Sequence, residues 1–227
     1  MDLRVPEERV HLRSRSRGFT LTEALVAMLL MSIVIAAVFS AYRYQLFAIK
    51  GQDMQLETQE AGRGIIDLMT REIRMAGFNP RCLNVISGIS DARPQLLQVQ
   101  LDLNENGTTT DPVNDPAGEV VSYSFDSTTG SIQRTEGVNG TPVSLISGMT
   151  SAALSFVYYG VNDVVPLAPT GSPLALTPTE CGQVRRVKVT LQLQRANPYQ
   201  TGGPALVSKF VSNIDLRNRF LNGGAGC

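Results

Sequence analysis

The sequence of 227 residues contains a single histidine, His11, which lies near the amino terminus. The rest of the chain therefore has no histidine for general acid–base catalysis, a nucleophilic triad or a metal site. The three cysteines, Cys82, Cys181 and Cys227, lie far apart and form no Cys-x-x-Cys pair, which disfavours zinc binding and thioredoxin-type redox chemistry. No pair of carboxylates has a context that indicates catalysis either. We predict that the protein is not an enzyme.

The sequence also lacks an excess of charge of either sign, because 20 basic and 20 acidic residues give a formal net charge of +0. The two signs are nevertheless unevenly distributed. Without residues 1–18 the chain keeps 15 basic and 17 acidic residues, a net charge of −2. A nearly neutral chain whose basic cluster lies in one short segment argues against nucleic-acid binding. Its length suits one globular domain beyond the amino-terminal region.

One long hydrophobic run dominates the amino-terminal region, because residues 24–42 carry no charge. As a helix, its first 18 residues would rise about 27 Å, close to the ~30 Å hydrocarbon core of a bilayer. A buried helix of a soluble protein is the alternative, but it does not explain why arginines flank only one end. We therefore predict a transmembrane helix over residues 19–42, with the leader of residues 1–18 on the cytoplasmic side. The leader's arginines are Arg4, Arg9, Arg13, Arg15 and Arg17.

The segment Arg17–Glu23 reads Arg-Gly-Phe-Thr-Leu-Thr-Glu and places its glycine before the apolar run. A secretory signal peptide has its cleavage site after the apolar core instead. The arrangement resembles the class III signal of type IV prepilins and pseudopilins. This resemblance implies cleavage between Gly18 and Phe19 by a prepilin peptidase, methylation of the new amino terminus at Phe19, and an assembly role for Glu23.

Glu23 also stands out on physical grounds. A carboxylate in the bilayer core costs on the order of 3 kcal/mol or more, so it is usually found with a partner. The resemblance to prepilins implies that Glu23 pairs with the amino terminus of a neighbouring subunit, which would select pilins for docking and set their axial stagger. The alternative is a carboxylate at the helix end with no specific role.

Beyond the apolar run the helical pattern continues over residues 43–78 and becomes amphipathic. Apolar residues recur every three or four positions, and Asp67 and Arg71 are spaced for an ion pair on the helix surface. Three glycines weaken this helix and could permit bending or close packing. Gly77 and Pro80 predict its end, so the helix is expected from Phe19 to Phe78. The apolar positions are Ala61, Ile65, Leu68, Met69, Ile73 and Ala76, and the glycines are Gly51, Gly62 and Gly64.

From residue 95 onward the sequence favours strands. A hairpin is predicted around Ser127–Gly130, and the strand at Val184–Gln194 has the clearest alternation of apolar and polar residues. The predicted strands are Leu97–Leu103, Glu119–Phe125, Ser131–Thr135, Ser155–Tyr159, Val184–Gln194 and Ala205–Val211. We predict an α+β fold in which the long helix packs on a mainly antiparallel sheet, with residues 79–227 forming a periplasmic or extracellular β-rich domain.

Three further segments, Arg71–Phe78, Phe156–Gly160 and Val184–Leu191, resemble the PilW-like minor pilins and, more distantly, the J-type pseudopilins of type II secretion. The resemblance implies a non-enzymatic subunit of a type IV pilus. It would lie in the inner membrane with one span and a periplasmic carboxyl-terminal domain, and later in the pilus. Its partners would be prepilin peptidase, other minor pilins, the major pilin and a large tip adhesin. The alternatives are a pseudopilin and a membrane-anchored periplasmic module that binds calcium or DNA.

Cysteines of an exported domain lie in an oxidising compartment, where one disulfide is expected. Cys82 follows the long helix and Cys181 precedes the strongest strand, so a Cys82–Cys181 bond would tether helix to sheet and contribute about 3–5 kcal/mol. Cys227 is the alternative partner, and sequence alone allows all three pairings.

Asp102, Asn104 and Asn106 alternate before Gly107, as do the oxygen ligands at the start of a calcium loop. Asp111 and Asp115 could add further ligands. Val113, however, occupies the position where an EF-hand supplies its bidentate glutamate, and Asx-Gly clusters also form ordinary turns. Calcium is therefore the only cofactor that we consider, with an ordinary turn as the alternative.

Overall fold

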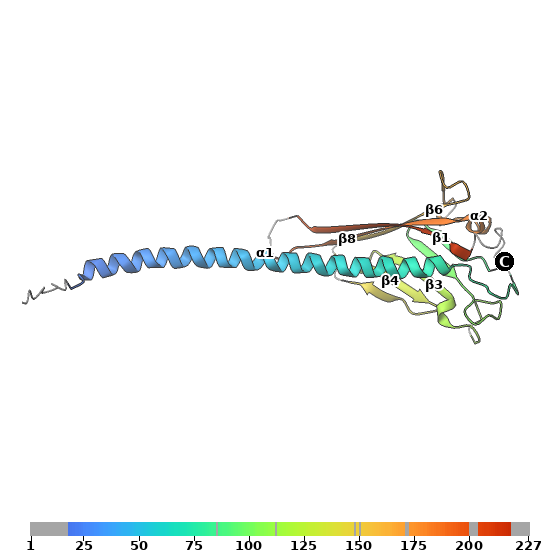
Figure 1. Cartoon of the computed structure of the whole chain (residues 1–227), viewed down its shortest axis with the longest axis horizontal. Helices are drawn as coiled ribbons and strands as arrows, with labels where there is room; N and C mark the ends of the chain where they lie inside the picture. Colours follow the sequence, from blue (N-terminus) through green and yellow to red (C-terminus); the bar gives the residue numbers. More distant parts are fainter. Residues whose placement is uncertain are drawn as a thin grey trace, which may run out of the picture. The chain divides into compact units, whose positions relative to one another are not determined.

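The structure, a computed structural model, describes residues 18–84, 86–111, 113–147, 149, 151–170, 173–199 and 204–218 (Figure 1). The chain divides into two compact units, residues 1–48 and 49–227. Helix α1 (Leu21–Met75) begins in the first unit and ends in the second. The predicted helix from Phe19 to Phe78 is therefore present, with both ends slightly inside the predicted bounds.

One face of α1 is buried within the second unit. The buried residues follow one another at spacings of three, four and seven positions, which places them on a single stripe of the helix. They are Gly51, Thr58, Gly62, Ile65, Met69 and Ile73. The predicted inward positions Ile65, Met69 and Ile73 are thus confirmed. Gly77 follows the helix with a φ of 78°, a left-handed conformation that glycine adopts without steric cost, and its N–H donates to the carbonyl oxygen of Gln100 at 2.8 Å.

The first sheet has five antiparallel strands in the order β1-β2-β3-β4-β5. They are β1 (Ile89–Arg93), β2 (Leu96–Gln100), β3 (Val120–Asp126), β4 (Ser131–Glu136) and β5 (Val143–Ile146), and a short 3-10 helix, η1 (Ala117–Glu119), precedes β3. The hairpin predicted at Ser127–Gly130 joins β3 to β4. In its turn, the Asp126 carboxylate accepts the Thr128 N–H at 2.8 Å, and Gly130 has a φ of 61°.

The second sheet has four antiparallel strands in the order β7-β6-β8-β9. They are β6 (Ser151–Tyr159), β7 (Pro166–Leu167), β8 (Arg186–Arg195) and β9 (Leu206–Asp215). Helix α2 (Pro178–Gln183) precedes β8 and begins with a capping box between Thr177 and Glu180, which satisfies N–H groups at the helix start. Along β8 every second side chain is buried, as predicted, namely Val187, Val189, Leu191 and Leu193.

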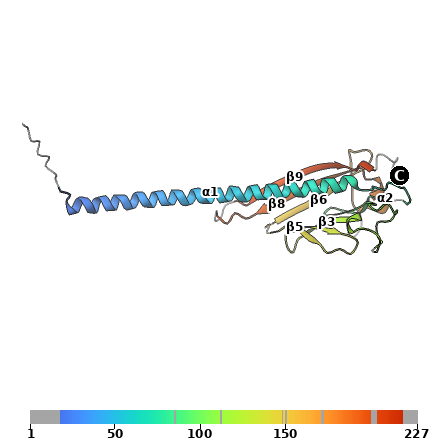
Figure 2. The same ribbon diagram turned by 60° about the horizontal axis from the view of Figure 1, so that its bottom comes forward.

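The part of α1 that lies in the second unit, from residue 49 onward, shares one hydrophobic core with both sheets. Figure 2 shows strands of both sheets beside this part of the helix. Tyr158 of β6 connects the sheets, because its buried hydroxyl group donates toward the carbonyl oxygens of Arg93 and Leu96 at 2.8 and 3.1 Å. On the second sheet, Phe210 packs directly on α1. A Cβ atom at Gly62 would lie only 2.2 Å from Cε2 of Phe210, so this contact depends on glycine.

A polar cluster joins α1 to the first sheet. The Glu72 carboxylate accepts hydrogen bonds from the Tyr123 hydroxyl and from Arg134, whose Nη2 lies 2.6 Å from Oε1. The Glu72 and Arg134 side chains are only 19% and 18% exposed. Burial lowers the pKa of Arg134, but the hydrogen bonds that its guanidinium donates to Glu72 and Glu136 outweigh this effect and raise the pKa overall. Burial and the bond to Glu72 raise the pKa of Tyr123, so it donates as a neutral hydroxyl at neutral pH.

The predicted α+β architecture is confirmed, but the single sheet that we expected is two sheets. The predicted strand Leu97–Leu103 ends at Gln100, because the chain turns into the Asp102 loop. Strands β1, β5 and β7 and helix α2 were not predicted. The sequence of β1, Ile-Ser-Asp-Ala-Arg, has too many polar residues to be recognised, and β7 has only two residues.

Candidate functional site

The predicted cleavage site lies immediately before α1. Gly18 is exposed, and a Cβ atom there would have no heavy atom within 4 Å. Phe19 is 83% exposed, and the helix begins two residues later at Leu21. Within the described residues, the Gly18–Phe19 peptide bond is thus accessible and no group crowds the glycine.

Glu23 lies in the first turn of α1 and caps it. Its Oε2 accepts the Thr20 N–H at 2.9 Å and the Thr20 hydroxyl at 2.8 Å, and the Thr20 Oγ1 accepts the Glu23 N–H at 3.3 Å. This reciprocal arrangement satisfies N–H groups that a helix start leaves without partners. Within the described residues, Oε1 of Glu23 forms no hydrogen bond, so one carboxylate oxygen remains available.

The surface that follows Glu23 is apolar on all sides. Of the described helices, only α1 is long and apolar enough to cross a membrane, and none of its most apolar 18-residue window is buried. The hydroxyl groups that interrupt it, Ser32 and Ser40, donate to the carbonyl oxygens of Leu29 and Ala37 at 2.7 and 2.8 Å. These bonds leave the apolar surface without an unsatisfied hydroxyl donor.

Residues 13–39 match the prokaryotic N-terminal methylation motif. The match covers the glycine, the phenylalanine, the glutamate and most of the apolar run. Together with the long helix packed on antiparallel sheets, it supports a type IV pilin-like protein, either a pilin or a pseudopilin. The motif implies processing by prepilin peptidase, assembly with other pilins and membrane anchoring. No curated protein and no solved structure matches the chain.

The structure does not bring the two predicted disulfide partners together. Cys82, in the exposed loop after α1, is disulfide-bonded, whereas Cys181 in α2 is a thiol. The predicted Cys82–Cys181 bond is therefore wrong. Cys181 faces the core and is 2% exposed, while Cys82 lies at the surface, where it has a φ of 52°. The alternative partner, Cys227, lies outside the described residues.

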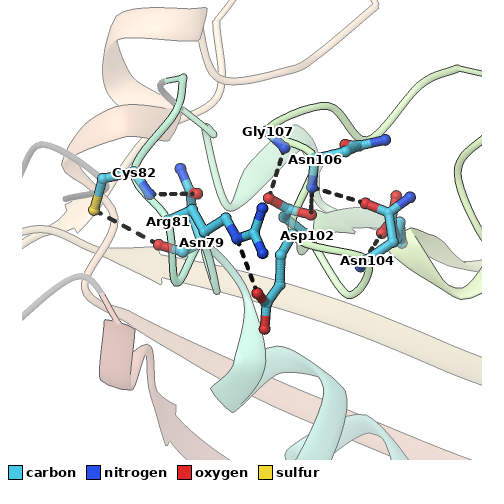
Figure 3. Close-up of polar contacts among 9 residues, drawn as sticks. Asn79, Arg81, Cys82, Asp102, Asn104, Asn106 and Gly107 are labelled. Carbon is cyan, nitrogen blue, oxygen red and sulfur yellow. Dashed lines mark hydrogen bonds and ion pairs between the residues drawn. The ribbon is translucent and has the colours of Figure 1, made fainter.

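The predicted calcium ligands do lie close together, in the loop between β2 and η1 (Figure 3). Asp102 is fully buried, and its two oxygens accept the N–H groups of Asn106 and Gly107 at 3.1 and 2.9 Å. Asn104 Oδ1 accepts the Asn106 N–H at 3.0 Å. Within the described residues, no group of three or more histidine, cysteine or acidic side chains is arranged to hold a metal. A cation here would therefore need amide or backbone oxygens as well as carboxylates.

Sequence reasoning missed two residues of these sites, Thr20 and Glu119, whereas Asp115 was named as a possible calcium ligand. Thr20 shares the cap of Glu23, and the Thr-x-x-Glu spacing of a capping box was a signal that could have identified it. Glu119 and Asp115 join the Asp102 loop from its far end. Glu119 Oε1 accepts the N–H groups of Leu103 and Asn104 at 2.8 and 2.9 Å, a long-range contact for which the sequence carries no local signal.

Proposed function

We propose that this chain is a minor pilin of the PilW type that is cleaved between Gly18 and Phe19 and joins a type IV pilus. Residues 19–42 hold it in the inner membrane until assembly, and the domain beyond lies on the periplasmic side. The observation that carries the proposal is an accessible Gly18–Phe19 bond directly before a fully exposed apolar helix that contains a single carboxylate near its start.

The exposed apolar surface of α1 must be shielded from water by lipid or by other protein. An apolar surface of this size is unfavourable in water, since each Å² removed from water gains about 25 cal/mol. Lipid covers it in the membrane, and the helices of neighbouring subunits would cover it in a fibre. A pilus subunit needs both environments in succession, which explains a helix that is apolar on every side rather than on one stripe.

Glu23 is arranged to take part in that transition. The Thr20 cap uses only one of its oxygens, and cleavage after Gly18 leaves the Phe19–Thr20 peptide bond intact, so the cap persists in the mature chain. Cleavage also creates a positive amine at Phe19. The free oxygen of Glu23 is suited to accept such an amine from an adjacent subunit, which would compensate a charge that is costly in an apolar environment.

The arginines of the leader support the proposed orientation. Five positive residues before Gly18 favour a cytoplasmic leader, because positive flanking segments remain on the cytoplasmic side. Partners of the mature subunit would be other minor pilins, the major pilin and a large tip adhesin.

The test is mass spectrometry of pili sheared from cells that express the chain. We expect a peptide that begins with N-methylated Phe19, present in the sheared fraction and absent from a strain without prepilin peptidase. A chain that stays in the membrane with residues 1–18 attached would overturn the proposal.

A J-type pseudopilin is the alternative, because pseudopilins carry the same motif. It would also be methylated at Phe19. Deleting the gene would then abolish secretion of type II substrates and leave pilus number unchanged, whereas deletion of a minor pilin reduces pilus number.

A further inference from the structure

The loop between β2 and β3 concentrates negative charge. Residues 102–119 contain five acidic residues and no lysine or arginine. Among the described residues, Glu105 alone has a basic partner, since its Oε2 lies 3.1 Å from Nε of Arg81. The other four carboxylates are Asp102, Asp111, Asp115 and Glu119. Such a segment is self-repelling and favours the binding of a cation.

Two of these carboxylates are buried on segments that are hydrogen-bonded to each other. Asp102 and Glu119 both have 0% exposure. The N–H groups of Leu101 and Leu103, on either side of Asp102, bond to the carbonyl oxygen and to Oε1 of Glu119 at 2.9 and 2.8 Å. Two buried like charges on neighbouring segments repel each other, and burying an uncompensated charge is costly.

Glu119 shows that the compensation is incomplete. Its Oε1 accepts two backbone N–H groups, but its buried Oε2 has no hydrogen-bond partner within the described residues. A buried carboxylate oxygen without a donor is uncommon in folded proteins and indicates a missing ligand or proton.

Asp115 links the end of the loop to its beginning through hydrogen bonds. Its Oδ1 accepts hydrogen bonds from the side-chain amide nitrogens of Asn106 and Asn104 at 2.6 and 3.3 Å, and its Oδ2 accepts the Asp111 N–H at 2.7 Å. Because Asp115 binds the amide nitrogens, it fixes which way the two side-chain amides face. A cleft of about 290 Å³ lined by Asp111, Asp115 and Glu136 gives solvent access to this part of the loop.

We propose that this loop binds one divalent cation of the calcium type, with Asp102 and Glu119 as its two carboxylate ligands. Asn104 and Asn106 supply neutral oxygens, and Asp115 is a positioning residue for their amides. One cation of charge +2 balances the two buried carboxylates. Calcium fits better than magnesium or zinc, because it accepts six to eight oxygen ligands in irregular geometry and needs no histidine or cysteine. The inference does not depend on the proposed pilin function.

The test uses the full chain in detergent, stripped of metal with EGTA and titrated with CaCl2 by isothermal calorimetry. We expect one bound calcium and a higher Tm in millimolar CaCl2. Glu119→Gln keeps the shape of the side chain but removes its charge, so calcium affinity should fall roughly tenfold or more. In EGTA the same variant should have a Tm equal to or above that of the wild type, because it no longer buries an unpaired charge.

The matched control is Asp126→Asn. Asp126 also accepts hydrogen bonds within a turn, from the Thr128 N–H and the Thr129 hydroxyl, but it lies in the β3–β4 hairpin. This variant should bind calcium as the wild type does, and MgCl2 should give a much weaker response. Absence of calcium binding by the wild type, or equal affinity of Glu119→Gln and wild type, would overturn the proposal.

Discussion

Helix α1 is one continuous helix with two different surfaces. Its residues up to Ala48 belong to the first unit, and none of them is buried. From Gly51 onward, a stripe of buried residues packs on two sheets. The first part has no charge over residues 24–42, whereas the second carries Glu57, Asp67, Glu72 and other charged residues.

The difference indicates that the two parts of the helix are suited to different surroundings. In the second part, water surrounds the helix on all but one side, so charged residues occupy the exposed faces and apolar residues the buried stripe. In the first part every face is apolar, which is stable only in lipid or against other helices. Variants in the two parts should therefore affect different measurements, namely processing and assembly in the first and stability in the second.

The largest effect is expected at Gly18. Replacing it by phenylalanine should leave residues 1–18 attached, because the resemblance to prepilins implies a peptidase that requires a small residue before the cut. The described residues offer no steric obstacle to this change, since none of their heavy atoms lies within 4 Å of a Cβ at Gly18. Intact-mass measurement of the membrane fraction reports the result, and normal shortening of the variant would contradict the processing model.

A Glu23→Gln variant should separate processing from assembly. Cleavage and membrane insertion should be normal, because the amide still accepts the Thr20 bonds but carries no charge. Loss of about 1.4 kcal/mol of docking free energy would lower incorporation into pili about tenfold. Immunoblots of sheared and membrane fractions measure this ratio. Equal incorporation of variant and wild type would show that the carboxylate does not direct docking.

In the second part of α1, Glu72→Gln should lower stability and leave processing unchanged. The change removes one of the two partner charges of a largely buried Arg134, which keeps its ion pair with Glu136, and loss of a hydrogen bond between charged groups costs about 1.5–3 kcal/mol. Urea unfolding of the full chain in detergent, followed by tyrosine fluorescence, measures the loss. Asp67→Asn is the control, because its ion pair with Arg71 is exposed and should contribute less than about 1 kcal/mol.

The smallest effect on stability is expected for alanine substitutions at two glycines of α1. Gly62→Ala places a methyl group against the Phe210 ring, and such overpacking costs about 1–3 kcal/mol. Gly64→Ala meets no heavy atom within 4 Å and should stabilise the helix by up to about 1 kcal/mol. The same urea measurement reports both. If the two variants shift stability in the same direction, the close packing of Phe210 on α1 does not explain why residue 62 is a glycine.

Much of the fold could be predicted from local patterns. The period of the apolar residues identified α1 and the inward face of β8, and turn residues identified the β3–β4 hairpin. Strand β1 was missed because it lies at an edge of its sheet, where a half-polar sequence is stable once a neighbour supplies hydrogen bonds. The division into two sheets was missed because β6 pairs with β8 rather than with β5, a choice made by long-range packing.

The candidate sites divide in the same way. Gly18, Phe19 and Glu23 lie within six residues of one another, so the order of the side chains along the chain is sufficient to propose them as a site. The Asp102 loop required the fold, because Glu119 reaches Leu103 and Asn104 only after η1 brings it back. Only the tertiary structure decided that Cys181 faces the core while Cys82 lies at the surface, since burial depends on which elements pack together and not on spacing in the sequence.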